Sequence, residues 1–175
     1  MKGTHATWVG LLALCATATG WAQGAAPTDA QIAAIVVTAN QVDIDAGKLA
    51  KARASSKDVK DFAQMMITDH SSVNKSATEL VTRLHVTPEP NATSTSLAQG
   101  GKRNLATLRK LHGSAFDQAY IDHEVAYHQA VIDALDNTLI PNASNAELKA
   151  LLIKVRPAFV AHLAHARQLQ SALGS

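Results

Sequence analysis

Apolar side chains recur every three or four residues along most of the chain, the spacing that places them on one face of an α-helix. The first such stretch begins at Thr28, where Thr28 and Gln31 form the sequence pattern of a capping box. A second stretch begins at Ser55 and continues to about His85. Because little chain separates the two stretches, they predict a pair of antiparallel helices.

Residues 86–101 interrupt this pattern. They contain Pro88, Pro90, two glycines and the run T-S-T-S, a composition that predicts a loop or crossover. Residues 102–112 are predicted to form a short helix within this connection, ended by Gly113. The link between the second and third long helices is therefore expected to be long.

Two more helical stretches complete the chain. The third long helix is predicted from Ser114 to Pro141, and the fourth from Ser144 to about Leu173. Pro157 lies well inside the fourth stretch and predicts a kink, because proline removes a backbone N–H and frees a carbonyl. No strand pattern and no internal repeat is found. The predicted fold is all-α: a ferritin-like four-helix bundle with a long connection between helices two and three.

The first 24 residues follow a different pattern. Lys2 precedes an apolar run over residues 8–20, and small residues follow it, which predicts a secretory signal peptide cleaved near Ala22. The run is too short to span a bilayer as a helix, and residues 25–175 contain no second one. Cys15, the single cysteine, lies in this segment, so no disulfide is expected in the mature domain. A periplasmic or secreted location is predicted, and nothing in the pattern supports outer-membrane association.

Composition limits the partners. Hydrophobic residues make up 47% of the chain and aromatic residues only 4%, so the core is expected to be built from closely packed aliphatic side chains. The formal net charge of +2 is too small for a nucleic-acid-binding surface. A protein partner or a second copy of the chain remains open.

Three segments resemble the DUF4142 family. They are F-A-Q-M-M-I-T-D-H over residues 62–70 with Asn74 behind it, F-D-Q-A-Y-I over residues 116–121 with His128 behind it, and Pro157 followed by His162. The run A-N-Q-V-D-I-D-A-G-K-L-A over residues 39–50 is similar to the first-helix motif of that family, with Asp43 where glutamate is common. The resemblance implies an exported bacterial protein with a ferritin-like bundle, and it implies no biochemical role.

Each predicted long helix carries at least one ligand-type side chain on its inner stripe. Metal sites in helical bundles are built from carboxylates and imidazoles that project inward in this way. At about 1.5 Å per residue, His128 and His162 differ in height by on the order of 10 Å, so one centre and two tiers both remain open. The candidate metal ligands are Asp43, His70, Glu124, His128 and His162.

Three functions remain open for these residues. The first is a binding or stress-associated module that holds a single zinc, copper or iron ion. The second is a metal-dependent redox enzyme of the oxidase or peroxidase type. A ferritin-type di-iron site is disfavoured, because the chain has four glutamates and no Glu-x-x-His motif. No nucleophilic catalytic residue and no organic cofactor is predicted.

The third function is a metal-free structural or partner-binding bundle whose buried histidines are hydrogen-bonded. In that interpretation Asn74 is expected to bond His70, and Asp69 to bond a neighbouring helix end. Asp117 is expected to cap its own helix, and the Tyr120 hydroxyl to be satisfied within the core.

Overall fold

The computed structural model describes residues 26–174. The signal peptide predicted for residues 1–24, including Cys15 and the cleavage position near Ala22, lies outside the described residues.

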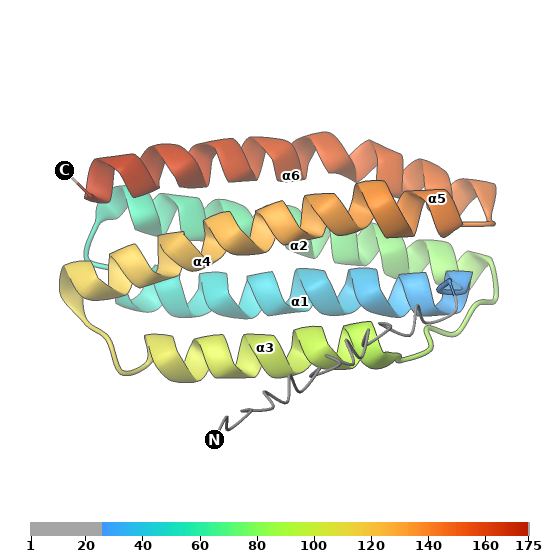
Figure 1. The fold of residues 1–175 in the computed structure, drawn as a ribbon, viewed down its shortest axis with the longest axis horizontal. Helices are drawn as coiled ribbons and strands as arrows, with labels where there is room; N and C mark the ends of the chain where they lie inside the picture. Colours follow the sequence, from blue (N-terminus) through green and yellow to red (C-terminus); the bar gives the residue numbers. More distant parts are fainter. Residues whose placement is uncertain (1–25, 175) are drawn as a thin grey trace, which may run out of the picture.

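Four long helices form an antiparallel bundle, and a fifth helix packs against it (Figure 1). Helix α1 (Asp29–Arg53) pairs with α2 (Lys57–Arg83), and α4 (Gly113–Ala134) pairs with α6 (Ala146–Leu173). Helices α2 and α4 run in the same direction because α3 (Ala92–Leu108) returns the chain between them (Figure 1). Residues 26–174 contain no strand. The predicted all-α bundle with a long connection is confirmed, and its ferritin-like character stays a prediction.

The connection between α2 and α4 differs from the prediction. Helix α3 begins at Ala92 and includes the T-S-T-S run that was expected to be loop. The reason is a capping box that the sequence analysis missed: Asn91 and Ser94 each accept a hydrogen bond from the backbone N–H of the other. Gly101 lies inside this helix because α3 approaches α1 closely there, with Val42 against the glycine.

Helix starts follow the predicted residue types but not always the predicted positions. The capping box at Thr28 is confirmed. Helices α2 and α6 each begin one residue later than expected, with Ser56 and Asn145 as caps. Asp117 does not cap its own helix. It accepts hydrogen bonds from the backbone N–H groups of Ser55 at 2.9 Å and Ser56 at 2.8 Å, and so fixes the start of α2 from α4.

The helix that begins as α4 ends at Asn142, one residue after the predicted stop at Pro141. A π-helical turn, η1 (Leu135–Leu139), follows α4 and leads into the short helix α5 (Ile140–Asn142). Pro141 is the second residue of α5, and the helix ends one residue after it. Helix α6 passes through Pro157 as one helix, and the kink expected there stays a prediction.

The core consists of two apolar clusters separated along the bundle by a polar layer. One cluster contains Ile32, Leu80, Leu139 and Phe159, and the other contains Val59, Phe62, Met66 and Phe116, each with further aliphatic neighbours. On every long helix the polar candidates fall between residues of these two clusters. The polar layer is therefore enclosed by apolar packing on both sides.

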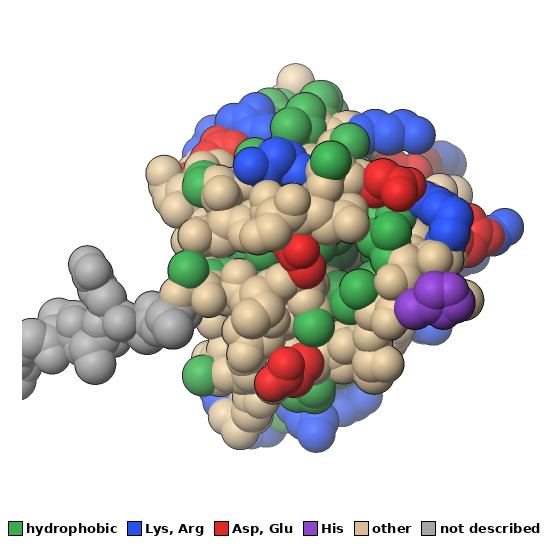
Figure 2. All heavy atoms as spheres, turned by 90° about the vertical axis from the view of Figure 1, so that its right-hand side faces the viewer, with side chains coloured by type: hydrophobic (Ala, Val, Ile, Leu, Met, Phe, Trp, Pro, Cys, Tyr) green, Lys and Arg blue, Asp and Glu red, His purple; other side chains and the backbone are tan. Residues whose placement is uncertain are grey.

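The outside of the bundle is mixed in character. Figure 2 shows basic, acidic and hydrophobic side chains interspersed over the end of the bundle where α6 starts. Within residues 26–174, no helix combines the length and the hydropathy needed to cross a bilayer.

A pair of adjacent glycines tests the packing of α3 against α1. A Cβ added at Gly101 would lie 2.8 Å from a Val42 methyl group, whereas one at Gly100 would meet only the Arg103 guanidinium at 3.8 Å. We expect Gly101→Ala to lower the free energy of unfolding by about 1–3 kcal/mol through overpacking. Gly100→Ala should raise it by up to about 1 kcal/mol through helix propensity. Urea denaturation measures both, and equal effects of the two substitutions would contradict the close approach.

Candidate metal centre

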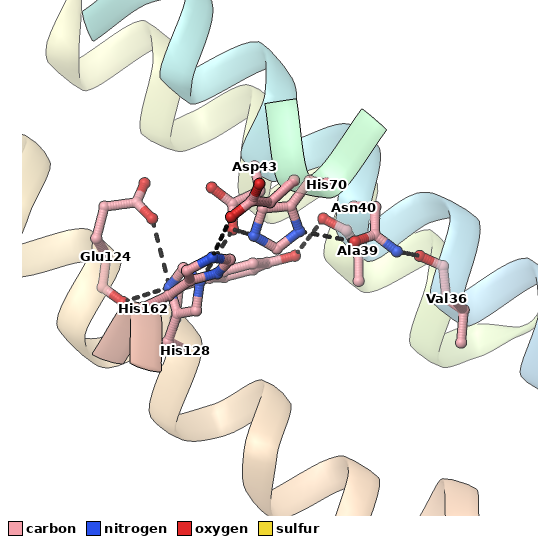
Figure 3. A network of polar contacts seen from close by, with 10 residues as sticks. Val36, Ala39, Asn40, Asp43, His70, Glu124, His128 and His162 are labelled. Carbon is pink, nitrogen blue, oxygen red and sulfur yellow. Dashed lines mark hydrogen bonds and ion pairs between the residues drawn. The ribbon is translucent and has the colours of Figure 1, made fainter. Parts of the chain in front are cut away.

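The five predicted ligand residues meet in the middle of the bundle. They come from four helices: Asp43 from α1, His70 from α2, Glu124 and His128 from α4, and His162 from α6. All five are buried, with at most 3% of each residue exposed. Their side chains point toward one another (Figure 3).

The three imidazoles form one cluster, so the alternative of two tiers is wrong. A ring nitrogen from each of His70, His128 and His162 lies within 4.8 Å of the other two. The height estimate failed because it placed the end of the third helix only about ten residues after His128. The helix continues through η1 and α5 to Asn142, and α6 begins at Ala146. His128 and His162 therefore lie at similar distances from the turn that joins their helices.

His70 is fixed by an asparagine that the sequence analysis missed. The His70 Nδ1 atom lies 2.7 Å from the Asn40 side-chain oxygen, and the Asn40 amide nitrogen donates to the Val36 carbonyl at 2.8 Å. The amide orientation makes its oxygen the acceptor, so Nδ1 carries the ring proton. Nε2 is left as a lone pair, 3.1 Å from Asp43 Oδ2 and without hydrogen-bond alignment.

Asn74, the predicted partner of His70, instead donates to the Val37 carbonyl. Asn40 lies one helical turn before Asp43 on α1, and this spacing was the available signal for it.

His128 is held by its own helix. Its Nδ1 donates to the Glu124 backbone carbonyl at 3.0 Å, since a carbonyl oxygen can only accept. The Nε2 atom of His128 therefore carries a free lone pair, 3.5 Å from Asp43 Oδ2 and with no hydrogen-bond partner among the described residues.

His162 has the same arrangement with its two nitrogens exchanged. Its Nε2 donates to Asp69 Oδ2 at 2.9 Å, and its Nδ1 is buried without a partner in residues 26–174. Asp69 was expected at a helix end, and its observed role is to orient this imidazole. It reaches His162 from the half-exposed rim of the site, with 44% of its side chain accessible.

The two buried carboxyl groups interact. Burial raises the pKa of Asp43 from 3.8 to about 7, and it raises the pKa of Glu124 well above its usual range. The neighbouring Glu124 carboxyl opposes the rise in the pKa of Asp43, and Asp43 in turn adds to the rise in the pKa of Glu124. Neither oxygen of Asp43 receives a hydrogen bond from an N–H group in the described part of the chain.

The imidazoles are held in the neutral form. Burial lowers the pKa of His70 far below its usual range and that of His128 to about 4, and neighbouring imidazoles add to both effects. The pKa of His162 is also lowered by burial, against the opposing effect of Asp69. Neutral imidazole is the form that coordinates metals.

The Tyr120 hydroxyl, expected to be satisfied, is buried beside this site and has no hydrogen-bond partner among residues 26–174. Burial, with Glu124 and Asp43 nearby, raises its pKa well above the usual value.

A family described as a domain of unknown function (DUF4142) matches residues 15–169, which is most of the chain. The chain belongs to this family. No curated protein and no solved structure matches it. The candidate metal centre is therefore assigned from the geometry of this DUF4142 protein alone.

The donor geometry in this DUF4142 protein suits one ion rather than two. A second group of ligand atoms, from Asp43, Glu124 and His128, shares His128 with the imidazole cluster, and its Asp43 Oδ2 atom lies 3.1 Å from His70 Nε2. The Nδ1 atom of His128 is already engaged by the Glu124 carbonyl, so this imidazole has a single free lone pair to offer. Of the four glutamates, only Glu124 lies in the site, which agrees with the argument against a ferritin-type di-iron centre.

The raised pKa of Asp43 predicts a pH dependence of stability in the metal-free protein. Because the folded-state pKa lies above the unfolded value, the contribution of Asp43 is complete below pH 3.8 and is lost as the pH rises to about 7. We expect the free energy of unfolding of the wild type, relative to Asp43→Asn, to fall by about 1.4 kcal/mol per pH unit between pH 5 and 7. This difference in the free energy of unfolding should become constant above that pH range.

Urea denaturation in the presence of a chelator measures this difference. Asp133→Asn, which neutralises an exposed acid on α4, controls for the general change in charge. A difference between wild type and Asp43→Asn that stays constant or grows with pH would contradict the assignment.

Proposed function

We propose that this protein binds a single transition-metal ion through His70, His128, His162 and Asp43. One observation carries the proposal: each of the three buried imidazoles donates its N–H to an outer partner and keeps its other nitrogen free inside the cluster. Histidine ligands of metals are oriented in this way by a carboxylate, a carbonyl or an amide behind them. Here these partners are Asp69, the Glu124 carbonyl and Asn40.

A metal accounts for the unpaired atoms better than a hydrogen-bonded core does. Buried polar atoms in folded proteins are nearly always paired, and an unpaired one costs about 1–3 kcal/mol. Three imidazole nitrogens and both Asp43 oxygens lack partners in the described residues. A divalent cation would be bound by all of these groups at once, with nitrogen distances of about 2.0–2.1 Å for zinc.

The donor set narrows the choice of ion. Three imidazoles and a carboxylate suit zinc, copper or iron, and no thiolate or thioether is among the donors. The pKa of Glu124 is raised by burial and by the neighbouring Asp43, which supports a single ionised carboxylate at the ion, with Glu124 retaining its proton. A redox enzyme with two bridging carboxylates gains no support from this arrangement. The N-terminal sequence pattern supports an exported protein, in which such a site would act outside the cytoplasm.

Metal binding is tested on protein purified without a histidine tag. We expect near-stoichiometric zinc, copper or iron by elemental analysis, or micromolar or tighter zinc binding by titration calorimetry after chelation. His70→Ala and His162→Ala each remove one ligand and should abolish the stoichiometric metal. His165→Ala is the matched control, because His165 lies one turn from His162 on α6 and packs against Phe62 outside the cluster.

Far-UV circular dichroism shows whether each variant is folded. If an alanine variant does not fold, His70→Gln and His162→Gln keep most of the side-chain volume and answer the same question. Wild type that neither contains metal nor binds zinc would overturn the proposal and leave the metal-free bundle.

Asp69 provides a second test that leaves the core intact. Asp69→Asn replaces a half-exposed carboxylate by an amide of the same shape, which holds the His162 ring less strongly. We expect zinc affinity to fall about 10–100-fold, as when other outer partners of metal ligands are lost. Competition with a chromophoric chelator measures this change. Asp61→Asn on the same helix is the control, and equal affinities of the two variants would contradict the role of Asp69.

A further inference from the structure

A cavity of about 140 Å³ lies beside the proposed metal site. Its wall includes Asp43, His70 and His128, so a molecule inside it would be in reach of the site. The remaining wall comes from α1, α3, α4, η1 and α6, with Val36, Leu97, Leu135, Leu139, Leu152 and Phe159 among its residues.

The wall has three further polar side chains, those of Asn40, Thr93 and Tyr127, and its other side chains are apolar. Two of the three are already engaged: the Tyr127 hydroxyl donates to the Ala39 carbonyl at 2.9 Å, and Asn40 bonds both Val36 and His70. Water needs two or more polar partners to occupy a cavity, so an apolar ligand is favoured over most of this space. An apolar cavity of about 150 Å³ is known to hold benzene.

The π-helical turn contributes to this space. Leu135 and Leu139, at the two ends of η1, both line the cavity. Single π-turns inside α-helices occur frequently at functional sites, because the extra residue changes the local packing. The irregular turn therefore lies where the helix borders the cavity.

The cavity adjoins a groove on the outside of the bundle. Thr93, Leu97 and Tyr127 line both the cavity and an outer groove between α3 and α4. At these positions one side chain separates the cavity from the groove.

We propose that the cavity binds a small, mostly apolar organic molecule of about six carbon atoms, with one polar end directed at Asp43, His70 and His128. The apolar character and the size of the molecule are inferred from the volume and the lining of the cavity. The orientation of the polar end rests on the proposed function, because that end of the molecule would bind to the metal ion.

The apolar part is tested first, on metal-free protein with benzene as the probe. We expect saturating benzene to raise the melting temperature by about 2–4 °C. Leu152→Phe fills the cavity and should abolish this shift. Leu148→Phe is the matched control, because Leu148 lies one turn away in the same core cluster but does not line the cavity, and this variant should keep the shift.

If Leu148→Phe does not fold, Leu148→Met takes its place. No benzene shift in the wild type, or equal shifts in the Leu152 and Leu148 variants, would overturn the cavity as a binding site. Zinc binding would be unaffected by that result, so the failure is distinct from failure of the proposed function.

The polar end is tested on cobalt-substituted protein. Phenol and benzene have similar volumes, but only phenol can contact the ion. We expect phenol to change the visible cobalt spectrum and to bind at least 10-fold more tightly to the cobalt form than to the metal-free form, with no such difference for benzene. Equal behaviour of the two probes would overturn the orientation.

Discussion

The buried polar layer at mid-bundle is the constraint on which the rest of the structure depends. Three imidazoles and two carboxyl groups are enclosed between two apolar clusters, where an unpaired polar atom is costly and a net charge far more so. Part of that cost is avoided because the buried groups are held in their neutral forms. Burial and the neighbouring Asp43 raise the pKa of Glu124, so Glu124 keeps its proton, and burial lowers the pKa of all three histidines, so they stay neutral. The lone pairs that remain unpaired converge on one point, and a cation there would account for them together.

The helix ends have to be placed accurately for this convergence to occur. Asp117 binds the start of α2 from α4, and Asp29 accepts hydrogen bonds from Ser144 and Asn145 at the turn before α6. Each contact ties one helix end to another and so sets their relative height. Because α4 continues through η1 and α5, the level of His162 matches that of His128. The same π-helical turn, η1, also borders the cavity. It therefore affects both the level of the histidines and the space beside them.

Helix α3 makes the bundle asymmetric around the candidate site. It packs along α1 but only lightly against α4, and the outer groove lies between α3 and α4. Contact with α1 is close because Gly101 allows Val42 to approach. The proposed metal site is thus covered by four helices, while the adjoining cavity is separated from the groove by single side chains of α3 and α4.

The helical fold and the inner face of each long helix follow from local features of the sequence. Helical periodicity and caps such as Thr28 are local, so they place Asp43, His70, Glu124, His128 and His162 on buried faces without knowledge of the neighbours. Only the tertiary structure decided which of these residues meet. That outcome depends on where α4 ends, on caps donated by other helices, and on partners such as Asn40 and Asp69 that act across or behind the cluster. These are contacts between distant segments, and a one-turn shift of one helix would separate the same side chains by about 5 Å.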